Sequence, residues 1–82
     1  MSRDILIGTY KILRKLGANR DDILPDADFK NDLFFDETDQ TCLLFFVESN
    51  FNISISKQEE SGLVTVNDLV EIVHKHKAAL LN

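Results

Sequence analysis

The chain of 82 residues has one cysteine, one proline, no tryptophan and no long apolar run. A single cysteine, Cys42, cannot form an intramolecular disulfide or an all-cysteine metal cage. No apolar run approaches the roughly 18–20 residues that cross a bilayer. Residues 1–4 also lack the basic and apolar regions of a signal peptide. We therefore expect one cytoplasmic domain over residues 1–82, with no membrane span.

Basic residues are scarce in one part of the chain. Residues 21–39 carry a net charge of −7, whereas the whole chain carries −5. Their only cation is Lys30, and their eight carboxylates belong to Asp21, Asp22, Asp26, Asp28, Asp32, Asp36, Glu37 and Asp39. Such a block repels nucleic acid and anionic lipid and attracts basic protein surfaces. We expect no nucleic-acid partner, and the block is either a docking surface or a solvated acidic loop.

Apolar side chains recur at spacings of three and four in residues 3–16, which predicts an amphipathic helix. Ser2 is its expected N-cap and Gly17 its left-handed C-cap. Residues 18–35 show no such period and predict a long loop. The helix face that we expect to be buried comprises Ile5, Leu6, Thr9, Ile12, Leu13 and Leu16, and the loop residues expected to reach the core are Ile23, Leu24, Phe29 and Leu33.

Three further helices have start signals. Asp36 and Asp39 are spaced as a capping box, and Leu43, Val47 and Phe51 follow at four-residue steps, which favours a helix over a buried strand. Capping signals at residues 56–59 and 65–68 predict a short third helix, ended by Gly62, and a fourth helix. The apolar side of the fourth comprises Leu69, Val70, Ile72, Val73 and Leu80. We expect an all-α four-helix bundle with a long loop between helices 1 and 2 and a short helix 3.

A set of residues spread over the chain matches one family pattern: Leu16, Gly17, Phe29, Asp32, Leu33, Asp36, Leu43, Glu48, Phe51, Ile55, Thr65 and Val66. Through this set the sequence resembles the bacterial acyl carrier proteins over about residues 5–76, without a gap. The resemblance implies a second helix that faces partner enzymes and a cavity among the helices that takes in an acyl chain. It also implies that Glu37 stands where the family has the serine that carries 4′-phosphopantetheine.

Three departures from the family pattern surround this position. Glu37 offers a carboxylate, which cannot form the phosphodiester that a serine hydroxyl forms. Phe34 and Phe35 replace a small Gly-Ala pair and put aromatic bulk where a transferase would approach, and Thr38 replaces a leucine. We expect no phosphopantetheine arm and no other cofactor. Glu37 is then either a favourable first-turn helix residue or a mimic of the modified serine.

Adjacent aromatic residues at 45 and 46 project about 100° apart on a helix and cannot both face one neighbour. We predict that Phe34 or Phe35, together with Phe45, makes an apolar patch rimmed by carboxylates. Such a patch would contact a partner protein or a second copy of the chain. The predicted partner-binding residues are Phe34, Phe35, Asp36, Glu37, Thr38, Asp39, Cys42, Phe45 and Glu48.

The sequence contains no pattern typical of a nucleophilic triad, a phosphate loop or a nucleic-acid surface, so we expect no catalytic residues. Asp68, Glu71 and His74 share one face of the last helix, but this face carries only one of the two histidines, so we expect no metal site. The predicted function is a non-enzymatic module that docks a basic, partly apolar protein, such as an enzyme of acyl or peptidyl assembly. The alternatives are a working carrier in fatty-acid, polyketide or related biosynthesis, and a non-covalent binder of a small ligand.

Overall fold

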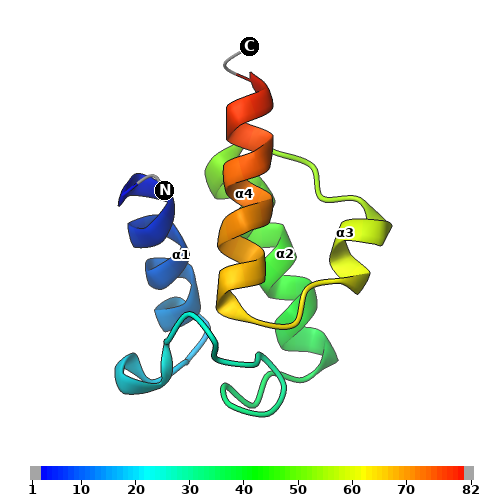
Figure 1. The fold of residues 1–82 in the computed structure, drawn as a ribbon. Coiled ribbons are helices and arrows are strands. Elements are labelled where there is room, and N and C mark those ends of the chain that lie inside the picture. Colours follow the sequence, from blue (N-terminus) through cyan, green and yellow to red (C-terminus); the bar gives the residue numbers. More distant parts are fainter. Residues whose placement is uncertain (1–2, 81–82) are drawn as a thin grey trace.

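The computed structural model describes residues 3–80, and the side chains of residues 3–78. The chain forms α1 (Arg3–Lys15), the 3-10 turn η1 (Arg20–Asp22), α2 (Glu37–Phe51), α3 (Lys57–Ser61) and α4 (Val66–Leu80). In Figure 1, α1 runs down, α2 and α4 run back up, and the short α3 lies to one side. The predicted four-helix, all-α architecture is confirmed. The predicted cap at Ser2 lies outside the described residues, whereas Gly17 has φ +100°, as a left-handed C-cap requires.

The core forms where α1 packs against both α2 and α4. The predicted inward stripe of α2, Leu43, Val47 and Phe51, is buried. A Cβ atom on Gly8 would lie 2.6 Å from Cζ of Phe51, so only glycine lets α1 approach α2 at this point. On α4 the predicted apolar side is confirmed for Leu69, Val70 and Val73, which are buried, and for Ile72, which packs against the core, while the side chain of Leu80 lies outside the described residues.

The long loop is fixed to the segment that begins α4. Phe29 N–H donates to the carbonyl oxygen of Val64, and Val66 N–H donates to that of Ala27, both at 3.0 Å. These bonds hold Phe29 in the core, where it is 1% exposed. Among the predicted loop anchors, Phe29 and Leu33 are buried and Ile23 is partly buried.

Two predicted core residues are on the surface. Leu24 is 54% exposed and Leu6 is 48% exposed. The chain turns between Leu24 and Ala27, and the N–H of Ala27 donates to the carbonyl oxygen of Leu24. Because of this turn, the loop contributes the small side chain of Ala27 to the core in place of Leu24. Because Leu6 is exposed, the buried face of α1 is narrower than its apolar pattern suggested.

Helix α3 begins with the predicted capping box. The Ser56 hydroxyl accepts the N–H of Glu59, and a Glu59 carboxylate oxygen accepts the N–H of Ser56. The same carboxylate receives His76 of α4, whose Nε2 lies 3.0 Å from Oε2. These bonds lower the pKa of Glu59 to about 2, first through the Ser56 N–H and then through His76. This link between α3 and α4 was not predicted, because its two residues lie 17 positions apart.

Glu59 should make stability depend on pH in the acid range. Its pKa is lower in the folded state than the ordinary 4.5, so its contribution is complete above about pH 4.5 and is lost as the pH falls toward about 2. Glu59→Gln keeps an acceptor for the Ser56 N–H but cannot ionise. Urea unfolding at a series of pH values should therefore show a smaller acid loss of stability for Glu59→Gln than for the wild type. The control is Glu60→Gln, an exposed neighbour; identical acid profiles for the wild type and Glu59→Gln would contradict the assignment.

Within the described residues, none of the helices has the length and apolarity needed to cross a bilayer. The same residues contain no cluster of three or more His, Cys, Asp or Glu side chains suited to a metal ion. The Asp68 carboxylate accepts the N–H groups of Val64 and Thr65 instead, which ties the start of α4 to the preceding segment and lowers the pKa of Asp68.

Candidate functional site: the start and outward face of α2

The first turn of α2 is held by a reciprocal pair of carboxylates. Oδ1 of Asp36 accepts the N–H of Asp39 at 2.8 Å, and Oδ2 of Asp39 accepts the N–H of Asp36 at 3.0 Å. The predicted capping box is thus confirmed. Glu37 follows as the first residue of the helix and is exposed. A carboxylate there is favoured by the positive end of the helix dipole.

Three of the four carboxylates predicted to meet partners are engaged within the chain. Asp36 and Asp39 cap the helix, and Oε2 of Glu48 accepts the N–H of Ile55 at 2.8 Å. Glu48 therefore fixes the segment that follows α2 and is half-buried. Among the described residues only Glu37, of these four, has no hydrogen-bond or ion-pair partner for its side chain.

Phe34 has an unfavourable backbone and an exposed side chain. Its φ is +59°, in the left-handed region, and its side chain is 80% exposed. The left-handed conformation costs a residue with a Cβ atom about 1–2 kcal/mol. Neither the local conformation nor burial therefore explains a phenylalanine here, and bulky residues in such positions are concentrated at functional sites.

Phe35 does not belong to the exposed patch. It is 6% exposed, and its ring stacks on that of Phe29 with the centroids 6.0 Å apart. The N–H of Phe35 also donates to the carbonyl oxygen of Phe29 at 2.8 Å. The left-handed backbone at Phe34 leaves the ring of Phe34 in solvent and the ring of Phe35 in the core. The prediction of a partner contact by Phe35 is therefore wrong, and Phe34 is the exposed member of the pair.

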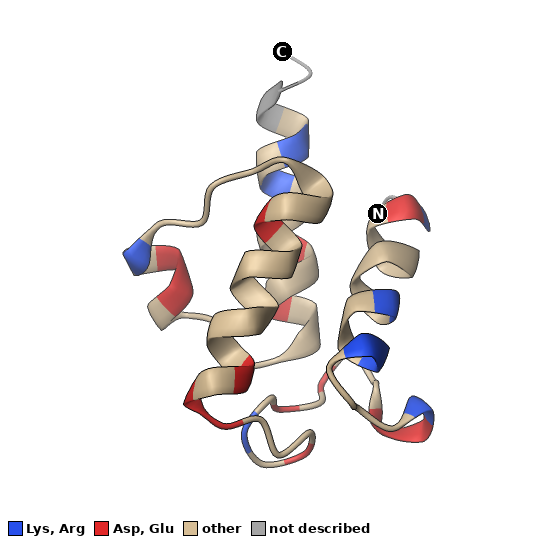
Figure 2. Cartoon of the chain, turned by 180° about the vertical axis from the view of Figure 1, so that it is seen from behind, with Lys and Arg blue, Asp and Glu red and all other residues tan. Residues whose placement is uncertain are grey.

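The outward face of α2 is uncharged along most of its length. Phe45 is 64% exposed, which confirms that it lies away from the inward stripe. Thr38 is also exposed and lies seven residues, or about two turns, before Phe45, on the same face. Cys42 is half-buried and lies at the edge of this face. Figure 2 shows acidic residues near the ends of α2 and an uncharged stretch between them.

Phe46 extends the aromatic surface toward α1. Its ring meets that of Phe45 edge to face, with the centroids 5.8 Å apart. Nζ of Lys15 lies 4.8 Å from the Phe46 centroid, which is within the range of a cation–π contact. Phe46 is partly buried, so Phe45 alone of this pair projects into solvent.

Hydrogen bonds between carboxylates and backbone N–H groups hold the acidic segment before α2. Oδ1 of Asp28 accepts the N–H groups of Lys30 and Asn31, and Oδ2 of Asp32 accepts the N–H of Asp28. The bonds from Asn31 and then Lys30 hold the pKa of Asp28 below its usual value. No carboxylate of residues 21–39 lies within ion-pair distance of a cation of the described chain. The negative charge of this segment is thus not neutralised by ion pairs.

The conformation of Phe34 was not predicted from the sequence. The available signal was the small Gly-Ala pair that the resemblance implies at residues 34 and 35. Glycine adopts positive φ without strain, so a glycine expected at residue 34 would have indicated a left-handed backbone there. In this chain the left-handed position is occupied by phenylalanine.

Comparison with curated proteins identifies the family. The chain is 35% identical over 65 residues to the "Acyl carrier protein" of Karelsulcia muelleri (strain GWSS), which covers 79% of this chain and 78% of the relative. The chain belongs to the acyl carrier protein family. No protein-family model matches it. In this acyl carrier protein-like chain, the exposed Phe34, Glu37 and Phe45 all lie at the start or on the outward face of α2.

Proposed function

We propose that this carrier-family chain is a cytoplasmic, non-enzymatic docking module whose α2 binds a basic and partly apolar surface of an acyl- or peptidyl-assembly enzyme. The observation that carries the proposal is Phe34, which is held at φ +59° and left 80% exposed directly before the helix. Aromatic residues, phenylalanine among them, are enriched at protein interfaces.

The negative charge supports the same partner surface. Asp21, Asp22 and Asp26 have exposed side chains, and none of them lies within ion-pair distance of a cation of the described chain. Such a field accelerates encounters with a basic surface and orients it before short-range contacts form. The uncharged outward face of α2 can then pack against apolar side chains of the partner, with Glu37 at its edge.

The chain is proposed to work without a phosphopantetheine arm. Glu37 provides no hydroxyl at the first residue of α2, where the resemblance implies the serine of the family. The nearest hydroxyls offer no equivalent. Thr41 Oγ1 donates to the carbonyl oxygen of Glu37 at 3.0 Å, and Thr38 carries a secondary hydroxyl that projects about 100° from residue 37.

The docking role can be tested on carrier-dependent enzymes encoded beside this gene. Isothermal titration at low and high salt should show binding that weakens as salt rises, because exposed charges are screened. Phe34→Gly removes the aromatic ring and fits the positive φ without strain. We expect it to weaken binding by about thirtyfold, equivalent to about 2 kcal/mol.

The matched control for this test is Ile7→Ala. Ile7 is 41% exposed and belongs to α1, so it should leave the affinity unchanged. Equal affinities of the wild type and Phe34→Gly, or binding that does not depend on salt, would remove the basis for the proposed docking surface.

A further inference from the structure

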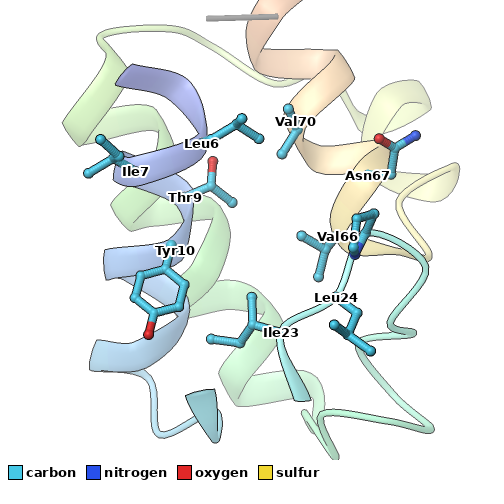
Figure 3. A pocket seen from close by; sticks show the side chains of 10 residues that line it. Leu6, Ile7, Thr9, Tyr10, Ile23, Leu24, Val66, Asn67 and Val70 are labelled. Carbon is cyan, nitrogen blue, oxygen red and sulfur yellow. The ribbon is translucent and has the colours of Figure 1, made fainter. Parts of the chain in front are cut away.

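A groove lies between α1, the loop near Leu24 and the start of α4 (Figure 3). Its volume is about 350 Å³, and pockets for small molecules usually have volumes of about 300–1,000 Å³. No residue of α2 lines it. The lining residues carry no formal charge: Leu6, Ile7, Thr9, Tyr10, Ile23, Leu24, Pro25, Val66, Asn67 and Val70.

Many of the exposed apolar side chains of the protein lie around this groove. Of the seven large apolar side chains that the described residues expose, four line the groove: Leu6, Ile7, Tyr10 and Leu24. Two of these, Leu6 and Leu24, are the residues that the sequence pattern placed in the core. Apolar side chains gathered around a hollow in this way are typical of a binding site.

Thr9 supplies an unpaired polar group to the same groove. Its side chain is 2% exposed, and its Oγ1 has no hydrogen-bond partner among the described residues. Figure 3 shows this hydroxyl on the side of α1 that faces α4, directed toward Leu6. An unpaired buried hydroxyl is unfavourable, so an acceptor on a bound molecule would remove a penalty as well as add a bond.

We propose that the groove binds a small neutral amphiphile, with an apolar body and one hydrogen-bond acceptor that receives the hydroxyl proton of Thr9. A charged head group is disfavoured inside, because no lining side chain carries an opposite charge. A docked helix is a poorer occupant, because its backbone carbonyl groups are already bonded internally and only a slender group reaches the buried hydroxyl of Thr9. This site goes beyond the proposed docking function and does not depend on α2.

The test uses methyl octanoate as a neutral probe and sodium octanoate as its charged counterpart. NMR titration of the intact chain should show saturable binding of the ester, with shifts centred on Leu6, Thr9 and Val70. The octanoate ion should bind at least tenfold more weakly. Thr9→Val removes the hydroxyl while keeping a branched side chain of similar size, and it should weaken ester binding about fivefold, the value of one hydrogen bond.

Two variants separate this site from the rest of the surface. Leu6→Glu places a carboxylate at the rim and should abolish ester binding, whereas Thr38→Val changes an exposed hydroxyl on α2 and should leave it unchanged. Thr9→Val should also raise the urea midpoint of the free protein, because it removes the unpaired hydroxyl. Equal affinities for ester and ion, unchanged binding by Thr9→Val, or dimerisation through this face would overturn the proposal. None of these results bears on docking by Phe34.

Discussion

Incubation with coenzyme A and a broad-specificity phosphopantetheinyl transferase should leave the intact mass of this protein unchanged. The transferase needs an alcohol to form a phosphodiester, and residue 37 is a glutamate at the first position of α2. Phe34 adds a second obstacle, because its exposed ring stands three residues before residue 37, where the resemblance implies the serine of the family. The expected effect is all or none, and intact-mass spectrometry measures it directly.

A variant with the residues that the resemblance implies at positions 34, 37 and 38 provides the control. Phe34→Gly, Glu37→Ser and Thr38→Leu together offer a primary hydroxyl, clear its approach and keep the left-handed turn. This triple variant should gain the mass of one phosphopantetheine arm under the same conditions. If the wild-type chain gained that mass, it would be a working carrier and the proposed arm-free docking would be wrong.

Phe29→Ala should destabilise the fold more than any change at the docking surface. Phe29 is 1% exposed and stacks on Phe35, and its N–H joins the long loop to Val64. Replacing a buried phenylalanine by alanine costs about 3–5 kcal/mol. A domain of this size has a total free energy of unfolding of about 4–12 kcal/mol. Urea unfolding followed by circular dichroism should therefore show a large fall in the midpoint, or a chain that is partly unfolded without denaturant.

The matched control changes Phe34, an aromatic residue of the same segment. Phe34→Gly removes an exposed ring and relieves a left-handed backbone, while glycine adds about 0.4–1 kcal/mol of chain entropy to the unfolded state. Its midpoint should stay at or slightly above that of the wild type. A loss of stability in Phe34→Gly as large as that in Phe29→Ala would show that the ring of Phe34 is needed for folding, and it would weaken the argument for partner contact.

The segment before α2 contains two neighbouring aromatic residues with opposite environments. Phe34 and Phe35 are adjacent in the sequence, yet one is 80% exposed and the other 6% exposed. A variant at Phe34 can therefore change recognition without changing the core. This separation makes the docking surface testable in a folded protein.

Local patterns in the sequence determined the helices and most of the core. The capping boxes at Asp36 and Ser56 and the cap at Gly17 have the predicted roles, because each depends on residues within a few positions of one another. The stripe formed by Leu43, Val47 and Phe51 was also predictable, since helical periodicity alone places these residues on one face. The same local signals place Glu37 in the first turn of α2.

Only the tertiary structure decided which of the remaining apolar and acidic side chains are available to a partner or ligand. Leu6 and Leu24 are apolar by sequence but exposed, because they line the groove between α1, the loop and the start of α4. Glu48 was predicted at the partner surface, but its carboxylate accepts the N–H of Ile55. Thr9 was predicted to be buried, and the structure adds that its hydroxyl has no hydrogen-bond partner among the described residues. These outcomes depend on contacts between segments that are distant in the chain or joined by irregular backbone, and helical periodicity contains no information about such contacts.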